Sequence, residues 1–134
     1  MKNMSHWFLR IAVLYLIVGV GLGIFMAASH DYTMRPVHAH LNLLGFVLLS
    51  LFGLFYRAFP AAVPTMLAKM HFGIYVPAHF VQMIALALYY RGHTAVEPIL
   101  AASSMLVGVA ILCFAVTVWK FTKTTPSSRV PSAG

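Results

Sequence analysis

The sequence predicts an all-α membrane protein that folds as a four-helix bundle. Of its 134 residues, 61% are hydrophobic and only 8% are charged, whereas soluble domains carry about 25% charged residues. Four apolar runs are each long enough, at about 20 residues, to cross a bilayer as a helix. The connections between the runs are short, so successive helices should be antiparallel and form one domain. The net charge of +7 comes mostly from basic residues beside the apolar runs, which indicates membrane topology and not nucleic-acid binding.

The expected helices cover about residues 7–28, 37–58, 66–90 and 97–119, which places the four-helix domain at 1–119. Residues 120–134 are rich in Thr, Ser, Pro and Lys, and we expect a disordered cytoplasmic tail there. Ala27-Ala28-Ser29 could be a signal-peptide cleavage site. The first apolar run is longer than the usual hydrophobic region of about 7–15 residues, which favours an uncleaved first helix.

The basic residues predict the orientation of the helices, because Lys and Arg concentrate on the cytoplasmic side. One side would hold seven of them: Lys2, Arg10, Arg57, Lys69, Lys120, Lys123 and Arg129. Only Arg35 and Arg91 would fall on the other side. We therefore expect an integral protein of a bacterial inner (plasma) membrane, with both termini in the cytoplasm.

In the first expected helix, Gly19, Gly23 and Ala27 form a stripe of small residues. Such a stripe lets another backbone or a flat ligand approach closely, and helix packing is its common use in membranes.

The second expected helix begins after Pro36 and carries His38 and His40 near its start. Ionisable side chains are expensive in hydrocarbon and are therefore functional candidates. A separation of two residues on a helix corresponds to a rotation of roughly 200°, so the two imidazoles should serve different partners on opposite flanks. Asn42 and Gly45 lie near the face of His38, and the missing side chain of Gly45 would leave room for a broad, flat group.

The third and fourth expected helices carry fewer functional signals. His71 in the third helix reads as an interfacial histidine near the cytoplasmic face. His79 reads as a hydrogen-bonded side chain within the membrane, because buried polar groups usually find partners. Pro77 should kink that helix. Cys113 in the fourth helix is the only cysteine, so no disulfide can form within the chain.

Two histidines on opposite flanks of a membrane helix are a suitable ligand set for haem. Haem iron takes axial imidazoles, and two of them give a six-coordinate electron-transfer centre. Arg35 and Arg91 lie at the level where haem propionates would meet water, and guanidinium groups pair with carboxylates. The candidate cofactor site therefore comprises His38 and His40 as metal ligands, with Arg35, Arg91, Asn42 and Gly45.

These residues also carry a resemblance to a known family. The run from Val37 to Phe46, followed by Gly53-Leu54-Phe55-Tyr56 and Pro60, resembles the tenth helix of haem-copper oxidase subunit I, most closely the cbb3 type. Residues 68–72 resemble the start of the following helix. The resemblance implies that His38 binds one haem, His40 binds another, and Arg91 lies in a loop that contacts propionates. The His-Pro-x-x-Tyr and His-His motifs of the copper site are absent from the sequence, so we expect no oxygen reductase activity.

That family arranges twelve helices as three arcs of four, and this chain would supply one arc. We therefore expect a homotrimer in the lipid bilayer that holds haem b between protomers and exchanges electrons with quinol or a periplasmic carrier. Three other functions remain open: a haem-based gas or nitric oxide sensor, an accessory subunit without chemistry, and a copper-handling protein. The copper ligands would be His30, Met34, His38 and His40, since thioether and imidazole suit Cu(I).

Overall fold

The computed structural model describes residues 3–123, and within them the chain is all helical apart from short connections. The first long helix is α1 (Met4–Ser29). The second is one continuous span, Arg35–Ala58, made of α2 (Arg35–His40), the π-helix η1 (Leu41–Leu48) and α3 (Leu49–Ala58). The third is α4 (Met66–Tyr90), and the fourth is α5 (Glu97–Phe121). Two 3-10 turns, η2 (Pro60–Ala62) and η3 (Thr94–Val96), precede α4 and α5.

All four helices are long and apolar enough to cross a membrane. The predicted all-α, four-helix architecture is therefore confirmed, and the helix bounds agree with the expected ranges to within a few residues. α5 continues to Phe121, two residues beyond the expected end of the helix. The rest of the tail predicted for 120–134 lies mostly outside the described residues, which end at residue 123.

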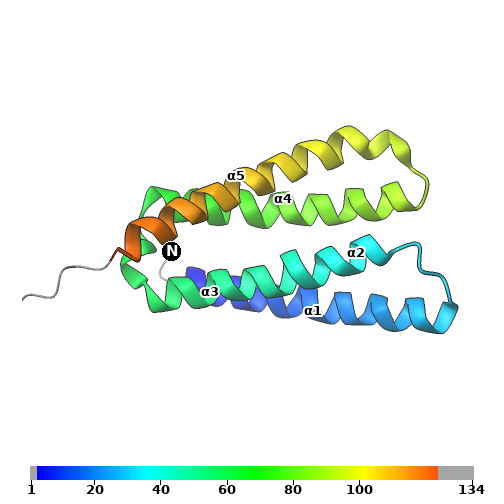
Figure 1. Ribbon diagram of the computed structural model, residues 1–134, viewed down its shortest axis with the longest axis horizontal. Coiled ribbons are helices and arrows are strands. Elements are labelled where there is room, and N and C mark those ends of the chain that lie inside the picture. The colour runs from blue at the N-terminus through cyan, green and yellow to red at the C-terminus, as the bar shows by residue number, and fades with distance from the viewer. Residues whose placement is uncertain (1–2, 124–134) are drawn as a thin grey trace, which may run out of the picture.

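The helices form two hairpins that lie side by side (Figure 1). In the first hairpin (residues 4–58), α1 packs along α2, η1 and α3, and in the second (residues 66–121), α4 packs along α5. The start of α1 and the end of α5 lie at the same end of the bundle, which we call the terminal face. The opposite end carries the connections 30–34 and 91–93, and we call it the loop face.

Local sequence signals explain where the helices begin and end. Pro36 and Pro98 occupy the first turns of α2 and α5, where a missing N–H costs nothing. The Thr65 hydroxyl caps α4 by accepting a hydrogen bond from the Ala68 amide at 3.3 Å. α1 ends at Ser29, and His30, the residue after it, adopts a left-handed conformation with φ 54°.

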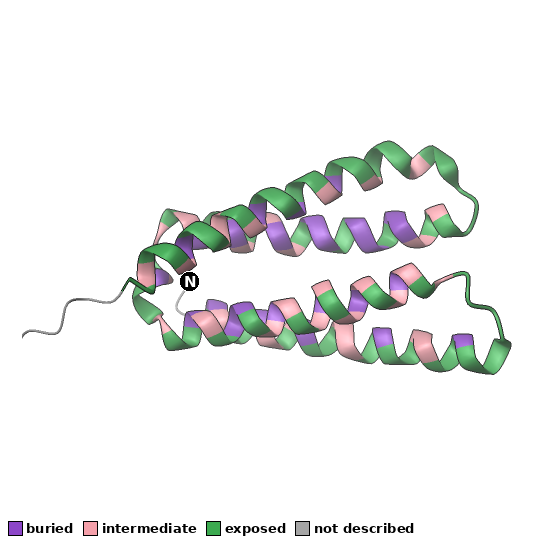
Figure 2. Ribbon diagram, in the orientation of Figure 1, coloured by how far each residue is buried: buried purple, intermediate pink, exposed green. Residues whose placement is uncertain are grey.

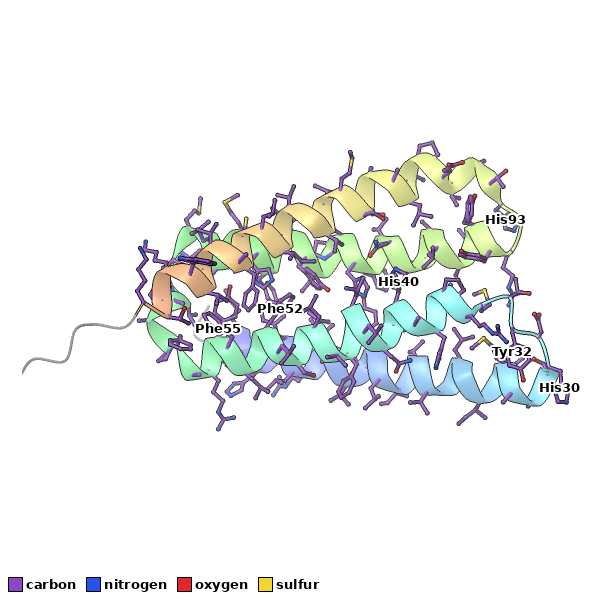
Figure 3. All side chains as sticks on the ribbon, in the orientation of Figure 1. His30, Tyr32, His40, Phe52, Phe55 and His93 are labelled. Carbon is purple, nitrogen blue, oxygen red and sulfur yellow. The ribbon has the colours of Figure 1, made fainter. Side chains whose placement is uncertain are left out.

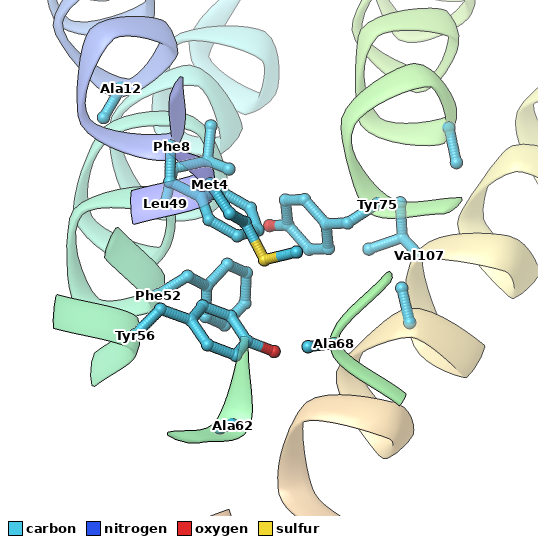
Figure 4. Close-up of a cluster of buried hydrophobic side chains, with 12 residues drawn as sticks. Met4, Phe8, Ala12, Leu49, Phe52, Tyr56, Ala62, Ala68, Tyr75 and Val107 are labelled. Carbon is cyan, nitrogen blue, oxygen red and sulfur yellow. The ribbon is translucent and has the colours of Figure 1, made fainter. Parts of the chain in front are cut away.

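The core is concentrated in the half of the bundle near the terminal face (Figure 4). Phe8 of α1 lies against Phe52 and Tyr56 of α3, with ring centroids 5.5 Å and 5.8 Å away. Tyr75 of α4 closes this cluster from the second hairpin, with its ring 5.0 Å from that of Phe52. A smaller cluster of Val37, Leu41, Met83 and Leu86 joins the hairpins nearer the loop face.

The outer surfaces of all four helices are exposed and rich in large apolar side chains (Figure 2). Leu14 and Ile17 on α1 and Met105 and Leu112 on α5 are more than 60% exposed. Apolar side chains outside and a narrow buried strip inside are what a bilayer environment favours, because lipid tails solvate such side chains.

The second span differs from a regular α-helix at Leu41–Leu48, where it adopts π-helical hydrogen bonding directly after His40. A π-turn is wider than an α-turn and shifts the angular positions of the residues that follow. The carbonyl of Leu44 in this segment accepts a hydrogen bond from the Tyr75 hydroxyl of α4 at 2.9 Å. The π-segment thus provides one of the polar links between the two hairpins. α4 remains one helix through Pro77.

Candidate haem site

The imidazole of His38 is held against α1. Its Nδ1 atom lies 2.8 Å from the carbonyl oxygen of Gly19. A Cβ atom at Gly23 would lie 2.8 Å from Cε1 of His38, so this ring rests where α1 has no side chain. The small-residue stripe of α1 therefore provides the space for a histidine from the neighbouring helix, and it serves helix packing within the chain.

The imidazole of His40 points away from α1. Its Nδ1 atom lies 2.7 Å from the carbonyl oxygen of Pro36 in the same helix. The side chain extends from α2 toward α4 (Figure 3). His38 faces α1 and His40 faces α4, so the two rings lie on different sides of the second span.

The hydrogen bonds of both rings fix the tautomer. A carbonyl oxygen can only accept a hydrogen bond, so in the neutral rings Nδ1 of His38 and Nδ1 of His40 each carry the proton. The Asn42 amide nitrogen, 3.3 Å from Nδ1 of His38, then donates to the His38 carbonyl and not to the ring. The Nε2 atoms then keep an unshared lone pair, and neither makes a hydrogen bond within residues 3–123. A histidine that ligates a metal through Nε2 has this second-shell arrangement, with Nδ1–H donated to a carbonyl.

Asn42 and Gly45 support the helix pair around His38. The Asn42 side chain donates a hydrogen bond to the His38 carbonyl at 2.9 Å, and a Cβ at Gly19 would lie 2.8 Å from its Nδ2. Gly45 is buried, and a Cβ there would lie 2.6 Å from Cγ of Tyr15. The expected open space beside Gly45 is therefore filled by the Tyr15 ring of α1. The expectation assumed an α-helical register, whereas Gly45 lies within the π-segment.

Arg35 and Arg91 are both exposed at the loop face, as their sequence positions predict. The Arg35 guanidinium lies 4.7 Å from the centroid of the Tyr32 ring. Arg91 directly follows α4, and its charge reaches Asp31 in the connection of the other hairpin. The pKa of Asp31 is lowered mainly by hydrogen bonds from the hydroxyl and amide of Thr33, with a further contribution from Arg91. Arg35 of the first hairpin and Arg91 of the second thus both lie at the loop face.

His71 and His79 are fully buried in α4. Nδ1 of His71 lies 2.9 Å from the Tyr56 hydroxyl, and Nδ1 of His79 lies 3.1 Å from Oε1 of Gln82. For His79, this contact agrees with the expected hydrogen-bonded histidine at one ring nitrogen only. His71, expected as an interfacial histidine, is instead buried in the core. The Nε2 atoms are buried without any hydrogen-bond partner in the described part of the chain. Sequence reasoning missed these unpartnered ring nitrogens, although two histidines eight positions apart on one membrane helix are a signal for them.

Within residues 3–123, no three His, Cys, Asp or Glu side chains come together as a metal-binding group. In comparisons with known proteins, no family model, curated protein or solved structure matches this chain.

Proposed function

We propose that the protein is a b-type haem protein of the membrane that transfers electrons, with His38 of one protomer and His40 of its neighbour as the two axial ligands. The observation that carries the proposal is the shared state of the two rings. Both donate Nδ1–H to a backbone carbonyl, at 2.8 Å and 2.7 Å, and both keep the Nε2 lone pair for another partner. This donor set fits haem iron, which is commonly held by imidazole nitrogen.

The opposed directions of the two rings support a site between protomers. Because His38 faces α1 and His40 faces α4, both rings of one chain cannot reach the same iron. A ring of identical protomers brings the His38 side of one chain to the His40 side of the next. The resemblance to haem-copper oxidase subunit I supports a trimer, because the His-x-His helix of that family lies between two haem sites within three arcs of four helices.

The exposed guanidinium groups of Arg35 and Arg91 would hold the propionates at the loop face. Gly19, Gly23 and Asn42 would fix the orientation of His38 through packing and hydrogen bonds. The haem would supply one-electron redox chemistry, and two imidazole ligands leave no open coordination position. Electron transfer is therefore favoured over oxygen reduction, with quinol or a periplasmic carrier as the redox partner.

The test begins with protein expressed with ample haem supply and purified in detergent. We expect a low-spin, six-coordinate spectrum, about one haem per chain and a trimeric mass. His38→Ala and His40→Ala should each remove the low-spin spectrum, whereas His93→Ala, a control at the loop face, should keep it. Colourless wild-type protein, or a monomer with low-spin haem, would refute the proposal.

Co-expression of the two single variants separates an intermolecular site from an intramolecular one. A protomer with His38→Ala still offers His40, and a protomer with His40→Ala still offers His38. Mixed trimers would therefore regain some low-spin haem, which neither variant shows alone. Binding of carbon monoxide to the reduced protein would instead favour gas binding, and bound copper without a Soret band would favour copper handling.

A further inference from the structure

A ladder of aromatic and imidazole rings runs along the buried face of α4. His71, Tyr75 and His79 are spaced four residues apart, so they lie on one face of the helix. All three are 0% exposed. The centroid of the Tyr75 ring lies 5.8 Å from that of His71 and 5.7 Å from that of His79. Titratable and hydroxyl groups therefore follow one another along about two turns of helix in the interior of the bundle.

The ladder reaches the terminal face through Tyr56 of α3. The Tyr56 hydroxyl lies 2.9 Å from Nδ1 of His71. Tyr56 also lines a pocket of about 510 Å³ at the terminal face, which is also lined by Arg57 and Lys69. Tyr56 thus lies between this pocket and the first imidazole of the ladder.

A chain of hydrogen bonds fixes the state of His79 at the other end of the ladder. The Ser104 hydroxyl donates to the Leu100 carbonyl at 2.7 Å, so its oxygen accepts from the Gln82 amide nitrogen at 2.9 Å. Oε1 of Gln82 must then face His79, where it accepts the Nδ1 proton at 3.1 Å. The Nε2 atom of His79 therefore carries a lone pair, and it is buried without a donor in the described residues.

The apolar surroundings of the ladder make the burial of its polar atoms unfavourable in free energy. The His71 ring has Phe8, Phe52 and Phe114 within 5.3 Å, 4.3 Å and 5.1 Å, measured between centroids. Its Nε2 atom, like that of His79, has no partner among residues 3–123. Buried polar atoms are nearly always satisfied, so each unpartnered atom requires an explanation. Packing alone would be served by phenylalanine, and ionisable groups in membrane interiors often form proton relays.

We propose that Tyr56, His71, Tyr75 and His79 form a proton half-channel that leads from the pocket at the terminal face to the middle of the bundle. Histidine suits this role because it can accept a proton on one nitrogen and release one from the other. The Tyr56 hydroxyl passes its proton to Nδ1 of His71 and takes a replacement from water in the pocket. The Nε2–H of His71 gives up its proton at the same time, so the ring gains no net charge.

The later steps pass along the ladder toward His79. One water molecule can bridge polar atoms up to roughly 5.5 Å apart, and water molecules between the neighbouring rings would carry the proton from one polar group to the next. The Tyr75 hydroxyl donates to the Leu44 carbonyl at rest. In the relay it takes a proton on an oxygen lone pair and releases its own proton toward His79, so the phenol stays neutral. The proton ends on Nε2 of His79, which becomes an imidazolium, while its Nδ1–H remains donated to Oε1 of Gln82. The half-channel does not depend on haem, and it goes beyond electron transfer.

The experiment is solid-state NMR of full-length, ¹⁵N-histidine-labelled protein in lipid bilayers. The imidazole signals are assigned with His71→Gln and His79→Gln, and hydrogen exchange of each ring with water is measured. We expect water contact at both Nε2 atoms. Tyr56→Phe should slow exchange at both rings about fivefold, since a lost relay hydrogen bond is worth about 1 kcal/mol and about 1.4 kcal/mol is a factor of ten. Tyr75→Phe should slow exchange at His79 only.

Tyr90→Phe, on an exposed part of α4, is the matched control and should leave both rates unchanged. Absence of water contact at both rings would overturn the proposal. So would unchanged exchange in Tyr56→Phe, because protons would then enter from another side. The measurement is repeated on haem-free protein carrying His38→Ala, so its result does not depend on the haem proposal. If Tyr56→Phe fails to fold, the unequal effect of Tyr75→Phe on His71 and His79 decides.

Discussion

Nδ1 of His38 and the carbonyl oxygen of Gly19 lie 2.8 Å apart, and this contact couples the second span to the backbone of the first. The carbonyl belongs to a residue whose own side chain is only a hydrogen atom, so the imidazole can approach α1 closely. The direction of His38 Nε2 is therefore set by how α1 and α2 pack, and small changes on α1 should alter the proposed haem binding by His38.

Gly23→Ala is expected to displace the His38 imidazole, because the new Cβ would lie 2.8 Å from Cε1. Overpacking of this kind costs about 1–3 kcal/mol of stability. We expect a fall in haem content and a shift toward a high-spin spectrum, measured by absorption spectroscopy of the purified protein. Gly21→Ala is the control, since a Cβ there meets nothing within 4 Å. Equal spectra for the two variants would contradict the role of Gly23.

Gly45→Ala should destabilise the first hairpin, because its Cβ would lie 2.6 Å from the Tyr15 ring. We expect a loss of about 1–3 kcal/mol, measured as a lower midpoint of thermal unfolding in detergent. Gly73→Ala on α4 has no atom within 4 Å of the new Cβ. It should be neutral or slightly stabilising, by up to about 1 kcal/mol, since Ala favours helix over Gly. Similar midpoints for both variants would argue against close packing at Gly45.

Tyr56→Phe should lower stability by about 1–3 kcal/mol, because it leaves Nδ1 of His71 buried without a partner. The double variant Tyr56→Phe with His71→Phe removes both polar groups, and it should recover most of the loss. Denaturant unfolding followed by Trp fluorescence provides the measurement. A double variant less stable than Tyr56→Phe alone would mean that His71 contributes through other contacts.

The connection at the loop face should respond to acid through Asp31. Hydrogen bonds from Thr33 lower the pKa of this carboxyl below its ordinary value of 3.8. A lowered pKa in the folded state stabilises the connection above pH 3.8, and this stabilisation is lost as the pH falls through the lowered value. NMR titration of the Asp31 carboxyl in Thr33→Val should return the pKa toward 3.8. An unchanged pKa in that variant would assign the shift to the Thr33 amide and Arg91 instead of the hydroxyl.

The helices could be predicted from the sequence because their signals are local. Pro36 and Pro98 mark helix starts, and the apolar runs are long enough to leave no alternative to membrane spans. The opposite directions of His38 and His40 follow from helical rotation over two residues. The packing around Gly45 could not be predicted, because the π-segment at Leu41–Leu48 depends on contacts with other helices.

The polar ladder of α4 could not be predicted from the sequence, for a related reason. Tyr56 and His71 are separated by a turn between two helices, so their hydrogen bond depends on how the hairpins meet. The unpartnered state of His79 depends on Gln82 and Ser104, which lie on different helices. Pattern and spacing place such residues in a membrane, but only tertiary packing determines which of their atoms are satisfied.

The division into two hairpins has a consequence for biogenesis. Each hairpin has short connections and extensive contacts between its own helices, so each can be inserted into the bilayer as a separate unit during translation. The seam between them then closes through the Tyr75–Leu44 and Tyr56–His71 hydrogen bonds. Two gene fragments split within residues 59–65 and translated separately should therefore reassemble into the complete protein.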